Sequence, residues 1–299
     1  MNQDISICVL TENEMGWTEP FELDKVQILD NYYLSAQKSD IAFLKKMDTA
    51  RLLAGFRTTA GIDTKGVRPY GGWEDSLLGG HCVGHYLTAL AQAVKVTGDK
   101  ELKEKSQTLI AGLEECQKKL GTGFLFGAKV EDKEDVEKQF DILEGKKKGE
   151  TWVPWYNMHK VLAGLVDTYK YTGNETALLV AEKLGDWIYE RVSKWDLKTN
   201  QKVLETEYGG MNDCLYELYS HSHNKHHLEA AQKFDEKALF LMAAKGEKNC
   251  LDGKHANTQI PKFIGAIKRY NVLKQLGEAK QEDEAYLVDA EKFFEMVVK

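Results

Sequence analysis

The sequence lacks the patterns that mark several protein classes. Its five cysteines are scattered and form no C-x-x-C pair, which argues against a disulfide scaffold or a zinc ribbon. No apolar run approaches the roughly 18 residues that a membrane-spanning helix needs. Residues 1–20 have neither the basic region nor the long apolar region of a signal peptide. We therefore expect reduced thiols and a cytoplasmic location.

An excess of positive charge is also missing. The 299 residues carry a formal charge of −7, and the acidic and basic residues are interleaved, so no basic patch is present to bind phosphates or anionic lipids. Nucleic acid and membrane surfaces are therefore not expected as partners. Because 42% of the residues are hydrophobic, the chain is instead expected to be globular, with a substantial core.

Strand-like alternation is absent, and from about residue 25 onward the apolar periodicity is helical. Apolar residues repeat at intervals of three and four from Ala177 to Val192, which predicts one buried stripe along a helix. Similar stripes run through 28–56, 84–96, 102–116, 158–171, 211–221, 228–243, 260–276 and 285–298. Three of the four prolines lie in connectors, and Pro261 suits the first turn of a helix that begins near Thr258. The pattern predicts an all-α fold.

Similar turns indicate a repeat of helical hairpins. Thr-Gly-Asp at 97–99 and Thr-Gly-Asn at 172–174 each separate two helical segments. Such hairpins build either an open solenoid or a closed α/α toroid. Four long connectors, rich in Gly, Trp, Tyr and His, precede the first helices of hairpins: 57–81, 121–156, 194–210 and 246–258. They favour a toroid whose binding pocket lies at one end. The charged stretch 129–150 within them is expected to be a solvated excursion.

The first of four polar clusters contains Trp73, Glu74, His81 and His85. The two histidines have the i, i+4 spacing of a helical zinc site, but Cys82 stands where such a site has its glutamate base. The same residues suit a saccharide pocket, because indole faces stack on sugar C–H surfaces while His and Glu bond hydroxyls. Histidines satisfied within a helix packing surface are the third alternative.

The second and third clusters lie at the starts of two further helices. Trp152, Tyr156 and His159 stand together at the first, where aromatic side chains line either a core or a pocket. An imidazole in this position is also common in cores. Asn212 follows a Gly-Gly pair that allows close backbone approach to a ligand, and its side chain either contacts that ligand or caps the helix.

The fourth cluster is a polar run that contains His255 and Gln259. It directly precedes a helix that is otherwise patterned for burial, which makes His255 the single histidine best placed for ligand contact. Four other histidines lie in and beside a turn and are expected to face solvent: His221, His223, His226 and His227.

Taken in order, five sequence motifs closely resemble the catalytic domain of glycoside hydrolase families 127 and 146. They are GGWE, GHCVGHYLTALA, WYNMHKVLAGLVDTYKYTG, EYGGMNDCLYELY and LDGKHANTQIPKFIGAIKRY. The resemblance implies an (α/α)6 barrel, followed by β-sandwich domains, and removal of terminal β-L-arabinofuranose with retention of configuration. We expect an N-terminal extension over residues 1–24 and a partial barrel, incomplete at its C-terminal end, over residues 25–299. A partial ring would expose the apolar edges of its first and last units.

The resemblance further implies a cysteine nucleophile bound to zinc and a glutamate acid/base. Coordination by a metal removes the thiol proton at neutral pH. Since no cysteine here has a neighbouring cysteine, we assign no catalytic residue and no zinc ligand, and we expect both beyond Lys299. The resemblance also implies that His159 and His255 hold sugar hydroxyls. The predicted carbohydrate pocket comprises Trp73, Glu74, His81, His85, Trp152, Tyr156, His159, Asn212, His255 and Gln259.

Two other functions remain open from the sequence. A sugar epimerase, or another carbohydrate-active enzyme on the same toroid, would use a histidine pair to abstract and return a proton. A noncatalytic helical-repeat protein would bind sugar without turnover. The sugar, its linkage and the oligomeric state stay open.

Overall fold

The structure, a computed structural model, describes residues 20–130 and 132–298, and helices are the only regular elements among them. Four helices form an inner row, each packed against the next: α3 (His81–Thr97), α6 (Pro154–Thr172), α9 (Met211–Ser222) and α12 (Ala256–Gln275). An outer row pairs with them in hairpins: α4 (Lys100–Leu120), α7 (Glu175–Val192), α10 (Lys225–Lys233) and α13 (Glu284–Val298). The prediction of an all-α fold is confirmed.

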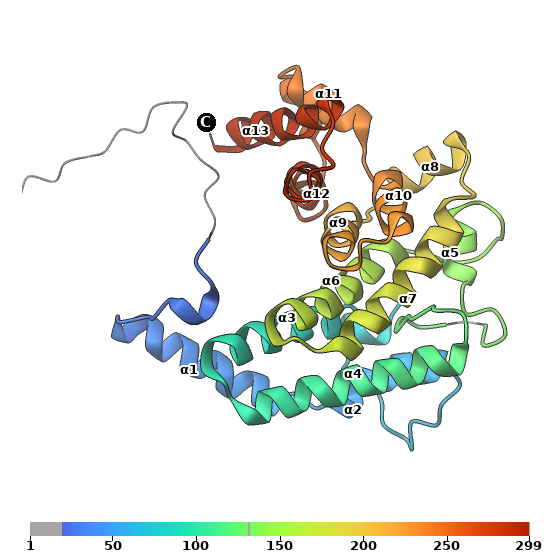
Figure 1. Cartoon of the computed structure of the whole chain (residues 1–299). Helices are drawn as coiled ribbons and strands as arrows, with labels where there is room; N and C mark the ends of the chain where they lie inside the picture. Colours follow the sequence, from blue (N-terminus) through green and yellow to red (C-terminus); the bar gives the residue numbers. More distant parts are fainter. Residues whose placement is uncertain (1–19, 131, 299) are drawn as a thin grey trace, which may run out of the picture.

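The two rows follow an open arc (Figure 1). One end carries α1 (Asn31–Lys46) and α2 (Thr49–Thr59), and the other carries α13 with α11 (Lys237–Ala244). Because α1 and α13 lie at opposite ends, the described residues do not close into a ring. None of the described helices is both long enough and apolar enough to cross a membrane. The cytoplasmic location stays a prediction.

The hairpin turns are built alike, which confirms the predicted repeat. Gly98 and Gly173 end α3 and α6 with φ angles of 66° and 68°, in the left-handed region that glycine adopts without strain. Asp99 and Asn174 follow, and their side chains accept hydrogen bonds from the first backbone N–H groups of α4 and α7. The turn after α9 repeats the arrangement with His223 (φ 53°) in place of glycine.

Two predicted helical segments are interrupted. Segment 28–56 divides at Asp48, whose side chain accepts hydrogen bonds from Ala50 N and Arg51 N and so starts a new helix. Segment 228–243 divides into α10 and α11. The expectation that Pro261 lies in a first turn near Thr258 is wrong, because α12 begins at Ala256 and the proline lies inside the helix.

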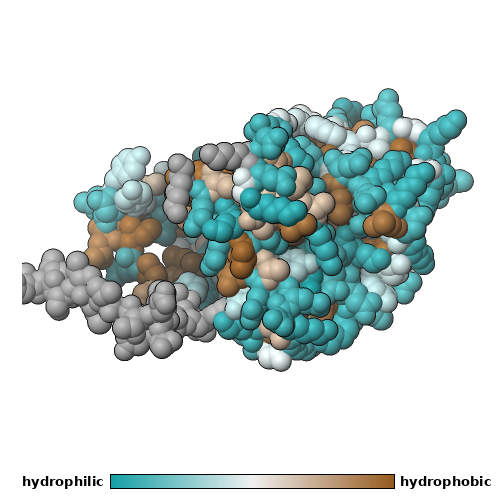
Figure 2. All heavy atoms as spheres, turned by 90° about the horizontal axis from the view of Figure 1, so that it is seen from above, coloured by the Kyte–Doolittle hydropathy of each residue, from teal (hydrophilic) through white to brown (hydrophobic). Residues whose placement is uncertain are grey.

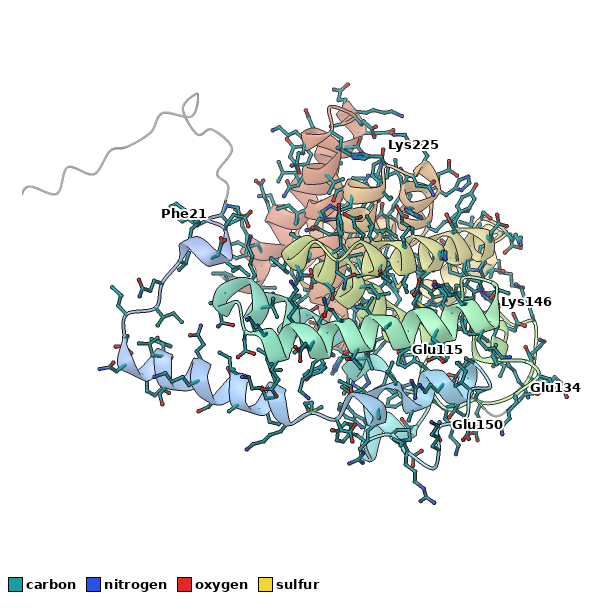
Figure 3. The ribbon with its side chains drawn as sticks, turned by 60° about the horizontal axis from the view of Figure 1, so that its bottom comes forward. Phe21, Glu115, Glu134, Lys146, Glu150 and Lys225 are labelled. Atoms are coloured by element: carbon teal, nitrogen blue, oxygen red, sulfur yellow. The ribbon has the colours of Figure 1, made fainter. Side chains whose placement is uncertain are left out.

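The expectation that residues 129–150 are wholly solvated is wrong for the middle of this segment. Glu134, Lys146 and Glu150 are exposed at the molecule's edge (Figure 3). Between them, α5 (Lys138–Leu143) places Phe140 in a core of Phe and Trp rings, where it is fully buried. The charges around this ring are matched by Arg191 of α7, which forms ion pairs with Glu137, Asp141 and Glu144.

Apolar side chains are exposed at both ends of the arc. Near the first end, Phe21 is 83% exposed and Leu29 81%. Figure 2 shows hydrophobic atoms gathered on the side where α1 lies in Figure 1. At the other end, Phe294 and Val298 are more than half exposed beside a cavity of about 560 Å³ between α12 and α13. Exposed apolar edges were expected of a partial ring, and the structure has them.

Candidate functional site

The four sequence clusters meet at the N-terminal ends of the inner helices. The start of α6 contacts the starts of the other three. Gly210 N at the start of α9 donates a hydrogen bond to His159 Nδ1 (3.1 Å), and Asn257 Nδ2 of α12 donates to the Tyr156 hydroxyl (2.9 Å). Asn157 Nδ2 donates to the Gly79 carbonyl just before α3. The predicted gathering of these segments at one end of the fold is confirmed.

The start of α6 divides its side chains between core and site. Pro154 occupies the first helical turn, where its missing N–H has no intrahelical partner to lose. Trp155 is fully buried among the core rings, whereas Tyr156 and His159, three residues apart, lie on the face that meets α9 and α12. Trp152, just before the helix, keeps 47% of its surface exposed.

His159 is a neutral donor within this site. Burial, together with the nearby charge of Lys160, holds the pKa of His159 well below its ordinary value. Because Nδ1 accepts a hydrogen bond from Gly210 N, the ring proton belongs on Nε2. A side chain at Gly209 (φ 61°) or Gly210 would press on this ring. The glycine pair, predicted to admit a ligand, thus makes room for His159.

Glu74 holds the start of α3. Its carboxylate is 8% exposed and accepts hydrogen bonds from Gly80 N (2.9 Å, at Oε2) and Cys82 N (3.1 Å, at Oε1). These N–H groups have no partner within the helix, so the carboxylate caps it. Burial alone would raise the pKa of Glu74, but hydrogen bonds from His81 and the backbone outweigh it, and the pKa is lowered.

His81 lies between Glu74 and Cys82. Its Nδ1 is 2.8 Å from Glu74 Oε1, and its Nε2 is 3.7 Å from Cys82 Sγ. Burial lowers the pKa of His81, but contacts with Cys82 and Glu74 outweigh this and raise the pKa to about 10. The His81 and His85 ring centroids are 6.2 Å apart. Carboxylate, imidazole and thiol donors of Glu74, His81 and Cys82 all lie within 4.8 Å of one another, which makes them a possible metal site.

The Asn212 side chain lies inside the fold, between α9 and α12. It is fully buried, and its Nδ2 donates to the Lys262 carbonyl (3.1 Å) and lies 3.4 Å from Asp235 Oδ1. The N-cap of α9 is Gly210, so the capping alternative for Asn212 is wrong. Gly265 of α12 packs directly on the amide. Asn212 therefore joins α9 to α12.

His255 and Gln259 lie at the start of α12. His255 is exposed at the N-cap position. Gln259 Nε2 donates to Thr258 Oγ1 (3.3 Å), while its buried Oε1 has no donor among the described residues. That oxygen can accept a hydrogen bond from a ligand. In contrast to the expectation for its turn, His227 is fully buried, with Nδ1 2.7 Å from Ser222 Oγ, because Gly185 leaves space for the ring.

Sequence reasoning missed three polar residues of this region. Lys160 places its Nζ 4.7 Å from the centroid of the Tyr156 ring. Asn257 holds the Tyr156 hydroxyl, and Asp213 follows Asn212 on α9. The signal was present in the sequence, because Lys160 and Asp213 each stand next to a chosen candidate at the start of a helix.

We expect the charge on Asp213 to reduce stability above pH 6. Burial raises the pKa of Asp213 from 3.8 to about 6, so the folded state favours the neutral acid. The resulting stabilisation is fully present below pH 3.8 and is lost as the pH rises through 6. Between pH 4 and 7.5 the loss should be about 2 kcal/mol, after allowance for partial contact with solvent.

Urea unfolding across this range should show the loss in the unmodified protein and not in Asp213→Asn. The exposed Asp252→Asn serves as control, and equal pH profiles for both variants would contradict the assignment.

Comparisons with known proteins identify the family of this chain. A family profile described as the beta-L-arabinofuranosidase GH127 catalytic domain matches residues 25–299, whereas no curated protein sequence matches. Two solved structures are similar in fold, each at 16% identity: a GH127 β-L-arabinofuranosidase from Geobacillus stearothermophilus T6 (TM-score 0.56) and another GH127 β-arabinofuranosidase (0.58). They cover 91% and 94% of this chain, which spans only 45% and 43% of theirs. The predicted fold class is confirmed, and the chain belongs to the GH127 catalytic-domain family of β-L-arabinofuranosidases.

Proposed function

We propose that this chain forms the sugar-binding part of a glycoside hydrolase that removes terminal β-L-arabinofuranose with retention of configuration. The observation that carries the proposal is the meeting of α3, α6, α9 and α12 at their N-terminal ends around His159 and Tyr156. Membership of the GH127 family supports the choice of a pentofuranoside. Arabinofuranosides of plant glycans are the proposed ligands.

The described side chains offer three kinds of sugar contact. Trp73 (67% exposed) and Trp152 present indole surface on which sugar C–H groups stack. The neutral His159 donates from Nε2, and Gln259 Oε1 accepts. The Tyr156 hydroxyl accepts from Asn257, so its own proton is free to donate. Such a set suits a polyhydroxyl ligand. His85 and His255 remain proposed contacts on the same basis of position.

The reacting groups are proposed to lie elsewhere in the protein. Retaining hydrolysis needs a nucleophile and an acid/base. The four cysteines in the described residues are free thiols on separate elements, so these residues do not form the multi-cysteine zinc centre that the family resemblance implies. Zinc would supply a deprotonated thiol nucleophile there. The role proposed for this chain is to bind and orient the sugar.

Trp73→Ala provides the direct test, because its exposed indole can be removed without opening the core. In a calorimetric titration with a β-L-arabinofuranosyl glycoside, the affinity of Trp73→Ala should be about tenfold lower than that of the unmodified chain. This difference is equivalent to about 1.4 kcal/mol of stacking. Phe43→Ala is the matched control, because Phe43 on α1 is an aromatic of similar exposure (61%), and it should leave affinity unchanged.

The same samples separate the alternatives. Absence of binding, or equal losses in both variants, would contradict the sugar site. Release of arabinose by the chain alone would contradict the placement of the reacting groups elsewhere. Isomerised free sugar would instead support an epimerase.

A further inference from the structure

A groove of about 810 Å³ opens between α8 (Leu197–Leu204) and the connector from α10 to α11. Asn200 Nδ2 of α8 donates a hydrogen bond to the Lys233 carbonyl at the end of α10 (2.7 Å), which fixes one wall of the groove against the other. Figure 1 shows α8 beside α10. The volume is within the range of about 300–1,000 Å³ that is usual for ligand sites, so the groove has room for several linked sugars.

Two contacts place the groove at the same end of the fold as the sugar site. Trp195 lines the groove, and its ring centroid lies 5.6 Å from that of Trp155, the residue before Tyr156. Glu236 also lines the groove, and its Oε2 accepts a hydrogen bond from Lys262 Nζ (2.6 Å) within the first two turns of α12. The groove therefore lies where a glycan longer than one sugar would continue from the site.

Trp195 brings an unpaired hydrogen-bond donor to this groove. Its side chain is only 6% exposed, and its buried Nε1 has no acceptor in residues 20–130 and 132–298. The rings of Trp155 and Phe234 meet the indole at 86° and 75° and hold it in place. An indole N–H only donates, and buried donors are ordinarily paired. A hydroxyl oxygen of a ligand in the groove can accept this hydrogen bond.

The rest of the lining suits a neutral ligand that carries hydroxyl groups. Gln201 and Gln232 are exposed, and each amide both donates and accepts hydrogen bonds. Leu197, which is 73% exposed, adds apolar surface for sugar C–H groups. The carboxylates of Asp235 and Glu236 already form ion pairs with cations of α12, and the other two acidic residues of the lining are balanced by two lysines. The lining therefore carries no unbalanced charge that would select an anion or a cation.

We propose that this groove is a second carbohydrate subsite, which binds the sugar units that follow the terminal arabinofuranose of a longer glycan. The proposal rests on the proposed function for the identity of the terminal sugar, while the groove itself is argued from its lining and from the unpaired Trp195 N–H. A trisaccharide that ends in β-L-arabinofuranose should bind about tenfold more tightly than methyl β-L-arabinofuranoside, because it adds one or two hydrogen bonds.

Nuclear magnetic resonance of the ¹⁵N-labelled chain tests both sites at once, because each tryptophan gives one indole N–H signal. The trisaccharide should shift the signals of Trp73 and Trp195, whereas the methyl glycoside should shift only that of Trp73. Trp155 is the internal control, because its Nε1 is also buried without an acceptor among the described residues, yet it does not line the groove. Its signal should move much less. The spectrum of Trp195→Phe assigns the Trp195 signal.

Calorimetry of two double variants measures the contribution of the groove. Gln201→Ala with Gln232→Ala should remove the tenfold gain of the trisaccharide and leave the affinity for the methyl glycoside unchanged. Gln107→Ala with Gln275→Ala, which removes two exposed amides outside the groove, should keep the gain.

The groove proposal is overturned if the trisaccharide leaves the Trp195 signal in place, whatever it does to Trp73, or if the Gln201 and Gln232 double variant keeps the gain. A shift at Trp195 without one at Trp73 would support the groove and contradict the proposed site for the terminal sugar. The two failures are therefore distinguishable.

Discussion

Gly84→Ala is expected to lower the free energy of unfolding by about 3–4 kcal/mol. In an exposed helix interior the same change would stabilise by about 1 kcal/mol, because alanine has the higher helix propensity. Here α3 and α6 pack backbone to backbone. A methyl group on Gly84 would overlap the Lys160 carbonyl, and Gly164 of α6 approaches Gly84 in return. Backbone atoms cannot rotate away, so the helices must separate.

Gly112→Ala on α4 is the matched control. Its added methyl group would meet the side chain of Leu53, which can adjust, so we expect a loss of about 1 kcal/mol. Urea unfolding of both variants gives the comparison. A Gly84→Ala protein as stable as the unmodified chain would contradict the close packing of α3 on α6. Because α3 carries His81 and α6 carries His159, their separation should also weaken sugar binding.

Arg269→Leu is expected to cost about 3–5 kcal/mol, because it leaves buried carboxylates without their counter-charge. Arg269 is 5% exposed. Its guanidinium donates to Asp235 Oδ2 (2.8 Å), Asp283 Oδ1 (2.8 Å) and the Tyr286 hydroxyl (2.9 Å). Tyr216 of α9 donates to the same Asp235 oxygen (2.7 Å). The network joins α9, α12 and α13 at one end of the arc.

The control for Arg269→Leu is Lys118→Ala, which removes an exposed ion pair with Glu114 on α4. Such pairs contribute at most about 0.5 kcal/mol. Unfolding in urea should separate the two variants clearly, and near-equal losses would contradict the role assigned to the network. The double variant Arg269→Leu with Asp235→Asn should lose less than the sum of its parts, because it removes one stranded charge.

Local features of the fold were predictable from the sequence. The helix α7 follows from the apolar spacing between Ala177 and Val192, and the turns at Gly98 and Gly173 follow from left-handed glycine before a capping Asp or Asn. These signals act over a few residues, so one sequence is sufficient to read them. The meeting of the polar clusters was predictable too, because each precedes an inner helix of a hairpin.

Burial of polar and charged segments was not predictable in the same way. Phe140 stands in a charged stretch, and it is buried because Arg191, about 50 positions later, neutralises the carboxylates beside it. His227 is buried because Gly185 leaves space opposite it. Asn212 is buried because the Lys262 carbonyl and Gly265 of α12 pack against its amide. Each outcome depends on a partner distant in sequence.

The sequence by itself determined the all-α hairpins and placed the polar residues at helix starts, since periodicity and capping depend on near neighbours. Only the tertiary structure decided what each group faces. The Cys82 thiol meets Nε2 of the adjacent His81 because Leu78 and Glu74 occupy the other side of the ring, and His159 meets Gly210 because α6 packs against α9. Such contacts follow from how helices pack and from which rotamers that packing allows, which local pattern does not specify.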